Sequence, residues 1–427
     1  MRVSLPGVRW APSESGLNRV IDDAVSRLLR WFMPSSSSRR SPEQVATTLA
    51  EAHRRHPTRT QLQTLGQTHE GRPIVALLIG DALQQPDPRP VVLLDGAHHG
   101  GELLSVDIVL DAIAVLLENH TPELAPRVER FRRELVFLCV PEVNPDGVHA
   151  VLTDSARSDR KNARDNNENG RVDAADGVDL NRNYPYRWGS LGEKGSSSDP
   201  KNVYYRGPAA ASEPETQAMM AAALEHHPVA SISFHTGTVA LLAPYTIAGA
   251  QNPEPNEAWI VAEELARQLP RHPQDRDFVL KKNLYPVDGT DQDWLRHELG
   301  TLALIVESAR SSPKTAEERV AIIDVVRHSW MLLCDRFLDG PSVSGQVKNA
   351  AGEPVVATVR IAEQALQEGE VWTTRMRDGR FDRFLPGPGT YTIVAEVAGQ
   401  PAVSAQVDGM AGRATVELII PEAPASP

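Results

Sequence analysis

The sequence has only two cysteines in 427 residues, so disulfide bonds cannot form its framework. Cys139 and Cys334 both lie in apolar segments, where we expect buried thiols. No apolar run approaches the roughly 18 residues of a membrane-spanning helix. Positive charge is also scarce: 44 Lys and Arg stand against 56 Asp and Glu, and the net charge is -12. This balance argues against a general binder of nucleic acid or of anionic membranes.

The first residues lack the apolar segment of a secretory signal peptide. For the sequence as given we therefore expect a cytoplasmic protein, and a secreted or periplasmic one if the N-terminus has been trimmed. Residues 1–40 are interpreted as an N-terminal extension, in which an amphipathic stretch precedes the flexible polar linker "PSSSSRR".

From Ser41 onward, short apolar runs rich in β-branched residues alternate with helical patterns. Such continuous runs are typical of strands buried on both faces of a sheet, and the alternation predicts an open α/β sheet with helices on both faces. We assign this domain to residues 41–340. The expected strands are 73–81, 89–96, 134–142, 229–237 and 301–309, and the expected helices are 41–57, 102–119, 212–227, 256–269 and 316–338.

The pattern changes after residue 340. Residues 341–421 contain short alternating strands with Gly and Pro turns and no helix signal. This pattern predicts a small antiparallel β-sandwich, followed by a frayed tail at 422–427.

The stretch "LLDGAHHGGELLSVDIVL" (93–110) places His99 and Glu102 where an apolar strand ends and a helix begins. His235 ends another apolar run, and ligands gather at the carboxyl ends of strands in open α/β sheets. Two histidines and one glutamate make a catalytic zinc site with a fourth position open. The H-x-x-E pattern alone is also typical of a polar loop, and spacing does not separate His98 from His99.

Further motifs follow in order: "PEVNPDG" (141–147), "RKNAR" (160–164), "GVDLNRNYPYRWG" (177–189), "YRGPAAASEPET" (205–216), "LYPVDGTDQDW" (284–294) and "LIVES" (304–308). Together these motifs resemble the zinc carboxypeptidase family of carboxypeptidase A type, over roughly 41–339. The resemblance implies a mixed open sheet. The segment "DGRFDRFLPGPGTYTIVAEVAG" resembles the transthyretin-like domain that follows the catalytic domain in the N/E-type branch.

The resemblance implies that His99, Glu102 and His235 are the zinc ligands, and that His98 has a packing or supporting role. It makes Glu307 the general base, since a zinc-activated water needs a carboxylate that takes its proton and passes it to the leaving amine.

The same resemblance implies that Asn181 and Arg182 bind the substrate's terminal carboxylate. A planar guanidinium can hold a carboxylate with two hydrogen bonds. Arg160 matches the arginine that stabilises the oxyanion, with Arg164 as the alternative because "RKNAR" carries one residue more than usual. Tyr285 matches the mobile tyrosine that caps the bound residue.

By this alignment the pocket for the terminal residue has Gln292 at its floor, and the acid that the N/E-type branch uses is replaced by Thr246. Asp291 is the nearest carboxylate, so we predict broad specificity with some activity on Lys or Arg termini. Gly101 stands where the family often has an arginine, so a remoter subsite should be weaker or built differently. The expected lining residues are Leu280, Val287, Thr290, Asp291, Gln292 and Ile305.

The segment "DNNENGRVDAAD" (165–176) matches a calcium-loop pattern, although no flanking helices of an EF-hand are expected. The same composition is typical of a solvated turn. The candidate calcium ligands are Asp165, Asn167, Asn169, Asp173 and Asp176.

These features predict a zinc-dependent exopeptidase that acts on the C-termini of peptides or proteins. The alternatives are the same chemistry on a specialised substrate, such as side-chain deglutamylation or cell-wall peptide trimming, and a non-catalytic binding protein on the same fold. The sandwich is either a stability module or a partner-binding unit. The oligomeric state is left open.

Overall fold

The computed structural model describes residues 39–84, 86–118, 121–153, 157–274, 277–410 and 412–421. The predicted N-terminal extension, apart from Arg39 and Arg40, and the predicted tail lie outside these residues. Within the described ranges, no helix combines the length and the apolar character needed to cross a membrane.

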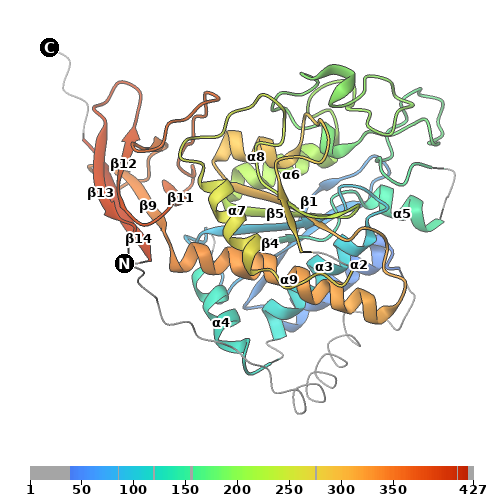
Figure 1. Ribbon diagram of the computed structural model, residues 1–427, viewed down its shortest axis with the longest axis horizontal. Coiled ribbons are helices and arrows are strands. Elements are labelled where there is room, and N and C mark those ends of the chain that lie inside the picture. Colours follow the sequence, from blue (N-terminus) through green and yellow to red (C-terminus); the bar gives the residue numbers. More distant parts are fainter. Residues whose placement is uncertain are drawn as a thin grey trace, which may run out of the picture.

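A mixed sheet forms the centre of the larger unit (Figure 1). It has eight strands, in the order β1-β2-β4-β3-β5-β8-β6-β7. The four central strands β4, β3, β5 and β8 are parallel, and antiparallel β2 and β6 flank them. The prediction of a mixed open α/β sheet is confirmed. The strands are β1 Thr60–Gln67, β2 Pro73–Ile79, β3 Val91–Gly96, β4 Val136–Val140, β5 Pro228–His235, β6 Val239–Leu242, β7 Val279–Lys281 and β8 Leu302–Ser308.

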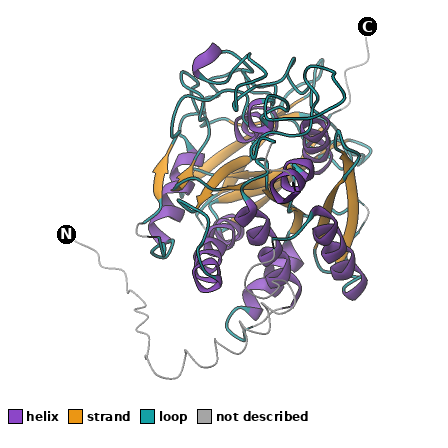
Figure 2. Cartoon of the chain, turned by 90° about the vertical axis from the view of Figure 1, so that its right-hand side faces the viewer, coloured by secondary structure: helices purple, strands orange, loops and turns teal. Residues whose placement is uncertain are grey.

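Helices cover both faces of this sheet, as Figure 2 shows. Along β3, Val92 and Leu94 face one apolar core, whereas Val91 and Leu93 face the other. Because successive side chains of a strand point to opposite faces, this double burial explains the continuous apolar runs. The first core includes α2 Pro42–Arg55, α3 Leu103–Glu118, α4 Ala125–Glu134, α5 Pro145–Thr153, α7 Glu257–Gln268 and α9 Ala316–Asp339, and the second includes α6 Pro214–His226 and α8 Asp291–Leu299.

Residues 342–420 form two three-stranded sheets around a separate core that includes Val343, Phe381 and Ile393. The predicted sandwich therefore has its two sheets, but β14 pairs with β9 in parallel, so the prediction of a purely antiparallel unit is wrong at that pair. The resemblance to transthyretin stays a prediction. The strands are β9 Ser342–Asn349, β10 Thr358–Ile361, β11 Arg380–Phe384, β12 Thr390–Glu396, β13 Val403–Asp408 and β14 Arg413–Ile420.

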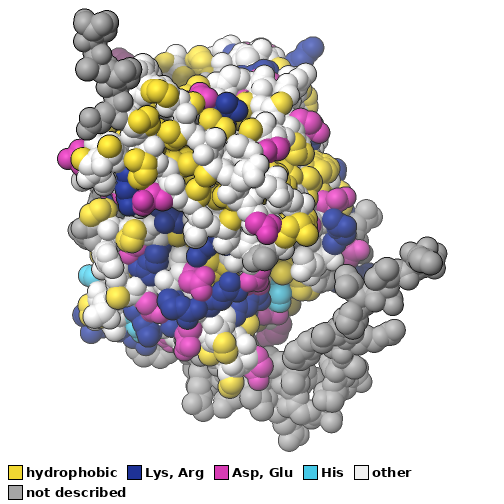
Figure 3. Space-filling model, turned by 90° about the vertical axis from the view of Figure 1, so that its left-hand side faces the viewer, with side chains coloured by type: hydrophobic (Ala, Val, Ile, Leu, Met, Phe, Trp, Pro, Cys, Tyr) yellow, Lys and Arg dark blue, Asp and Glu magenta, His cyan; other side chains and the backbone are white. Residues whose placement is uncertain are grey.

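Exposed hydrophobic side chains of this C-terminal unit include Met376, Val371 and Met410. On the face drawn in Figure 3, yellow hydrophobic side chains lie scattered among charged and polar ones. Such scattered residues are ordinary on the surface of a folded protein.

The C-terminal unit packs closely against the larger one through the segment between β10 and β11. Trp372 Nε1 donates to the carbonyl oxygen of Arg296 on α8 at 3.1 Å, and the Arg296 guanidinium lies 4.8 Å from the Trp372 ring. Glu370 accepts a hydrogen bond from the Tyr245 hydroxyl at 3.0 Å. The unit thus supports the helix and the loop that border the site described next.

Candidate active site

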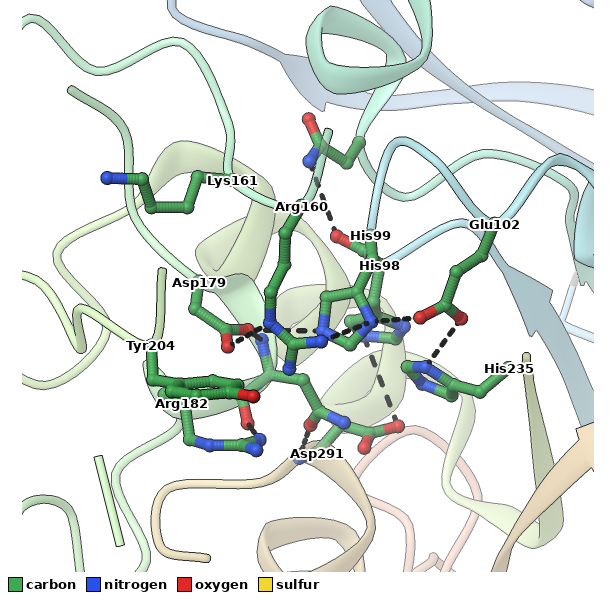
Figure 4. A network of polar contacts seen from close by, with 12 residues as sticks. His98, His99, Glu102, Arg160, Lys161, Asp179, Arg182, Tyr204, His235 and Asp291 are labelled. Carbon is green, nitrogen blue, oxygen red and sulfur yellow. Dashed lines mark hydrogen bonds and ion pairs between the residues drawn. The ribbon is translucent and has the colours of Figure 1, made fainter. Parts of the chain in front are cut away.

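His99, Glu102 and His235 converge at the carboxyl ends of β3 and β5 (Figure 4). His99 Nδ1 lies 2.6 Å from Glu102 Oε1, and His235 Nδ1 lies 3.0 Å from Glu102 Oε2. The tight turn between His99 and Glu102 requires a glycine at position 100, because a Cβ atom there would lie 2.2 Å from the backbone of Gly147. The sequence spacing therefore brings the three donor groups together.

The three side chains have the chemistry of a zinc site. Burial disfavours the charged carboxylate of Glu102, but the adjacent His99 and His235 outweigh it and hold its pKa well below the usual range. Two imidazole nitrogens and a carboxylate are the ligand set of catalytic zinc sites that keep one position open. The residues present therefore fit a zinc ion.

His98 lies outside this group of ligand atoms. Its imidazole is fully buried and faces Asp95 at 3.2 Å, the Tyr184 hydroxyl at 3.1 Å and Asp291 at 4.0 Å, while its ring stacks on His235 at 5.7 Å between centroids. This placement agrees with a packing or supporting role for His98 behind the three ligand candidates.

Asp179 was not singled out from the sequence, yet it links two site residues. Its carboxylate lies 3.2 Å from His99 Nε2 and accepts a hydrogen bond from Arg160 Nε at 2.7 Å. A carboxylate on the outer nitrogen of a metal-binding histidine fixes the ring orientation and its tautomer. The sequence feature that could have identified Asp179 is its position two residues before Asn181 in the same motif.

Glu307 lies on β8 beside His235 on β5 and lines the same cavity. Its Oε2 atom is buried and has no hydrogen-bond partner in the described part of the chain. Burial raises the pKa of Glu307 to about 7, with nearby Glu102 adding to the rise and His235 opposing it. A carboxyl group with a pKa near neutrality is suited to proton transfer.

Arg160, and not Arg164, reaches the ligand candidates. Arg160 Nη1 lies 3.4 Å from His99 Nδ1, whereas Arg164 pairs with the buried Glu213 at 3.2 Å and does not line the cavity. The choice of Arg160 from the motif is therefore consistent with the geometry.

Asn181 and Arg182 are buried at the inner wall of the cavity, on the short 3-10 helix Leu180–Arg182. Arg182 Nη2 lies 3.4 Å from the hydroxyl of Tyr285, and Arg182 Nε is buried without a partner among the described residues. The Tyr285 side chain is 46% exposed. A buried guanidinium with a free donor beside an exposed tyrosine is a binding point for an anion.

A cavity of about 240 Å³ joins these groups. Of the residues expected at the pocket for the terminal residue, Val287, Thr290 and Ile305 line it, together with Thr246. Thr246 is held in place by hydrogen bonds from its amide and hydroxyl to Asp293, at 2.7 and 2.8 Å. The full lining is His99, Glu102, Arg160, Asn181, Arg182, His235, Thr236, Gly237, Leu242, Thr246, Asn283, Leu284, Tyr285, Val287, Thr290, Ile305 and Glu307.

The structure places Leu280, Asp291 and Gln292 outside this lining. Asp291 is the first residue of α8, and its side chain turns back toward His98 while its amide donates to Asn181. The prediction that Asp291 and Gln292 face the terminal residue is therefore corrected. Beside Arg182 the cavity is lined by apolar side chains, threonines and Asn283.

The predicted calcium loop is built from hydrogen bonds within the loop. Asp165 accepts from the amide of Gly170 at 2.7 Å, and Asp176 accepts from the amides of Asn166 and Asp173, both at 3.0 Å. Asn167, Asn169 and Asp173 likewise accept from amides two residues further along. These are Asx turns. In the described part of the chain, the clusters of potential metal ligands do not include this loop, and calcium binding is not supported.

Comparison with known proteins agrees with the motifs. The family model described as zinc carboxypeptidase matches residues 45–320. A metallocarboxypeptidase A-like protein of Trichophyton verrucosum is 34% identical over 163 residues, which cover 38% of this chain and 35% of that protein. An inactive metallocarboxypeptidase of Paracoccidioides brasiliensis is 32% identical over 132 residues, which cover 31% of this chain and 21% of that protein.

The chain thus spans well under two thirds of these relatives. Among solved structures, thrombin-activatable fibrinolysis inhibitor superimposes with a TM-score of 0.61 at 20% identity, covering 75% of this chain and 80% of that one. This likeness supports the same fold. Since the family model covers more than half of the sequence, and the motifs meet in one cavity, the chain belongs to the zinc carboxypeptidase family.

Proposed function

We propose that this protein is a zinc-dependent carboxypeptidase that removes single residues from the C-termini of peptides. The observation that carries the proposal is the meeting of His99, Glu102 and His235 with Glu307 and Arg182 in one cavity. The first three supply a metal site, Glu307 a base, and Arg182 an anion-binding point.

His99, Glu102 and His235 would hold the zinc ion. When bound, zinc supplies Lewis-acid activation of a water molecule. Glu307 accepts a proton on its unpartnered Oε2 atom and returns it to the leaving amine. Arg160, which Asp179 orients, donates to the oxygen of the scissile carbonyl as negative charge develops there.

Arg182 and Asn181 account for the restriction to chain ends. A free carboxylate can accept from the Arg182 guanidinium, whereas an internal peptide group brings no charge to compensate this buried cation. Tyr285 closes over the bound residue from its exposed position beside Arg182.

The pocket lining supports apolar terminal residues. Leu242, Val287 and Ile305 offer apolar contact, and Thr246 and Thr290 offer neutral polar groups. Among the described residues, the only carboxylates in the cavity wall are Glu102 and Glu307, which are assigned to the metal site and to proton transfer. A lysine or arginine side chain entering here therefore finds no other carboxylate, and burying such a charge without a partner is costly. We therefore replace the predicted activity on basic termini by a preference for medium-sized apolar residues.

The test is a time course of peptide digestion followed by mass spectrometry. Free-acid peptides should lose one residue at a time from the C-terminus, while the same peptides with a C-terminal amide should stay intact. Chelation should abolish the activity and zinc should restore it. Since one relative is an inactive metallocarboxypeptidase, a zinc-loaded protein that cleaves no peptide of a broad panel would refute the proposal.

A further inference from the structure

A second cavity, of about 380 Å³, borders the metal site on the side away from the pocket for the terminal residue. It shares Thr236 with the first cavity and also includes Gly101. These two residues are the chain neighbours of the ligand candidates His235 and Glu102, so the two cavities meet at the metal site. Asn181, Arg182 and Tyr285 line the first cavity and not the second.

Cations dominate the lining of this second cavity. Arg39, Arg40, Lys314 and Arg319 stand against two carboxylates, Asp107 and Asp159, which leaves a surplus of two positive charges. The surplus is local, because the whole chain carries a net charge of -12. A cavity lined by charge of one sign concentrates ligands of the other sign.

The charges within the wall do not cancel. Arg40 and Arg319 each lie 3.3 Å from Asp107, so they share a single carboxylate. Glu142 also lies near Arg40, but burial disfavours its charged form and raises its pKa to about 8. Arg39 and Lys314 are exposed to solvent, and Glu318 is the charged neighbour of Lys314.

The path of a substrate leads into this cavity. With its terminal carboxylate at Arg182 and its scissile bond at the metal site, a bound peptide would leave the first cavity beside Thr236, which both cavities share. An extended chain advances about 3.3 Å per residue, so the second and third residues before the scissile bond would be the ones next to the second cavity. Gly101, where the family resemblance leads one to expect an arginine, brings no side chain to this cavity; Asp159 lies beside it, and the cations come from other segments.

We propose that this cavity binds a carboxylate side chain, so that the preferred substrates carry Asp or Glu two or three residues before the scissile bond. The proposal rests on the proposed carboxypeptidase function and specifies its substrate class. Partly exposed ion pairs contribute modestly and are screened by salt. We therefore expect a preference of about twofold to fivefold, and not an absolute requirement.

The test uses short N-blocked peptides with the same C-terminal leucine and with Glu, Gln or Lys at the two positions in question. The expected order of kcat/KM is Glu above Gln above Lys, and the Glu-to-Gln ratio should shrink as ionic strength rises. The double variant Arg39→Gln/Lys314→Gln should bring this ratio close to one. The control is Arg267→Gln on α7, whose side chain is 67% exposed and which should keep the ratio.

Equilibrium binding of the same peptides to the zinc-loaded Glu307→Gln protein gives the ratio even if turnover is absent. Absence of turnover in the wild type would then count against the proposed function, while the binding ratio still decides this proposal. Equal affinity for the Glu, Gln and Lys peptides, or a preference for Glu that persists in the double variant, would overturn it.

Discussion

His235 and Glu307 occupy paired positions on the adjacent parallel strands β5 and β8. Neighbouring strands lie about 4.8 Å apart, so the sheet itself sets the spacing between a metal-ligand candidate and the proposed base. Tyr285, in contrast, lies in the loop between β7 and α8 and is half exposed. The ligand candidate His235 and the proposed base Glu307 are therefore on strand ends, and the group proposed for closure is on a loop.

This relationship leads to the first prediction, for Glu307→Gln. The variant should retain stoichiometric zinc, because Glu307 is not among the ligand atoms, and should lose about 10²- to 10⁴-fold in kcat. Metal analysis and steady-state kinetics on one preparation measure both. Glu263→Gln, an exposed change on α7, is the matched control. Near-normal turnover in Glu307→Gln would exclude this residue as the base.

The second prediction concerns Arg182→Gln. Loss of charge-assisted hydrogen bonds to the terminal carboxylate should lower kcat/KM on free-acid peptides by about ten- to a hundredfold. Any residual cleavage of amidated peptides should change little, so discrimination between acid and amide falls. Arg267→Gln serves as the arginine control. An unchanged ratio of acid to amide cleavage would place the terminal carboxylate elsewhere.

Strands buried on both faces were predictable from the sequence because their patterns are continuous. β3, β5 and β8 all coincide with expected apolar runs, and α2 begins at the expected Ser41 cap. β1 was missed because its sequence "TQLQTLGQ" is only partly buried. β6 and β7 have four and three residues, which are too few to show a strand pattern. The sequence of α8 is polar, so its burial against Trp372 could not be predicted.

The candidate site divides in a similar way. Ligand type and order along the chain identified His99, Glu102, His235 and Glu307 as a group that the structure does bring together. The direction of Asp291 could not be predicted, because a residue at the start of a helix can face either side, and here it turns to His98. The calcium-loop pattern depends only on the presence of side-chain oxygens. It could not reveal that these oxygens accept hydrogen bonds from backbone amides of the same loop.

The third prediction is a pH dependence of stability at the junction of the two units. Burial lowers the pKa of His227 to about 4, and Arg383 and Arg375 of the C-terminal unit contribute. In the unfolded chain the pKa of this histidine is about 6.5, so between pH 4 and pH 6.5 the unfolded chain binds more protons than the folded one. Stability should therefore be greatest above about pH 6.5 and fall as the pH drops toward 4, by on the order of 1–2 kcal/mol from this group.

His227→Asn isolates this contribution. Residue 227 has φ +46°, a left-handed conformation that asparagine tolerates better than most residues. The variant should lose less stability than the wild type between about pH 7 and pH 5, as measured by urea unfolding at both values. His226 is buried in the same region with a pKa that burial also lowers to about 4, so part of the dependence should persist. If wild type and variant lose the same amount, His227 does not contribute.

The last prediction concerns Trp372, which couples the C-terminal unit to the larger one. Its side chain is 2% exposed, it lies over Arg296 of α8, and a Cβ atom on Gly300 would come within 2.6 Å of its ring. Trp372→Ala should therefore destabilise the protein by about 3–5 kcal/mol, the usual cost of removing a buried aromatic side chain. Because α8 follows directly on Thr290 of the substrate pocket, thermal unfolding and thermal inactivation should move to lower temperature together.

Met376→Ala, in the same segment but with a side chain 79% exposed, should leave both unchanged. Should Trp372→Ala unfold in two separate steps, with inactivation at the wild-type temperature, the C-terminal unit would be an independent module and not a support for the site.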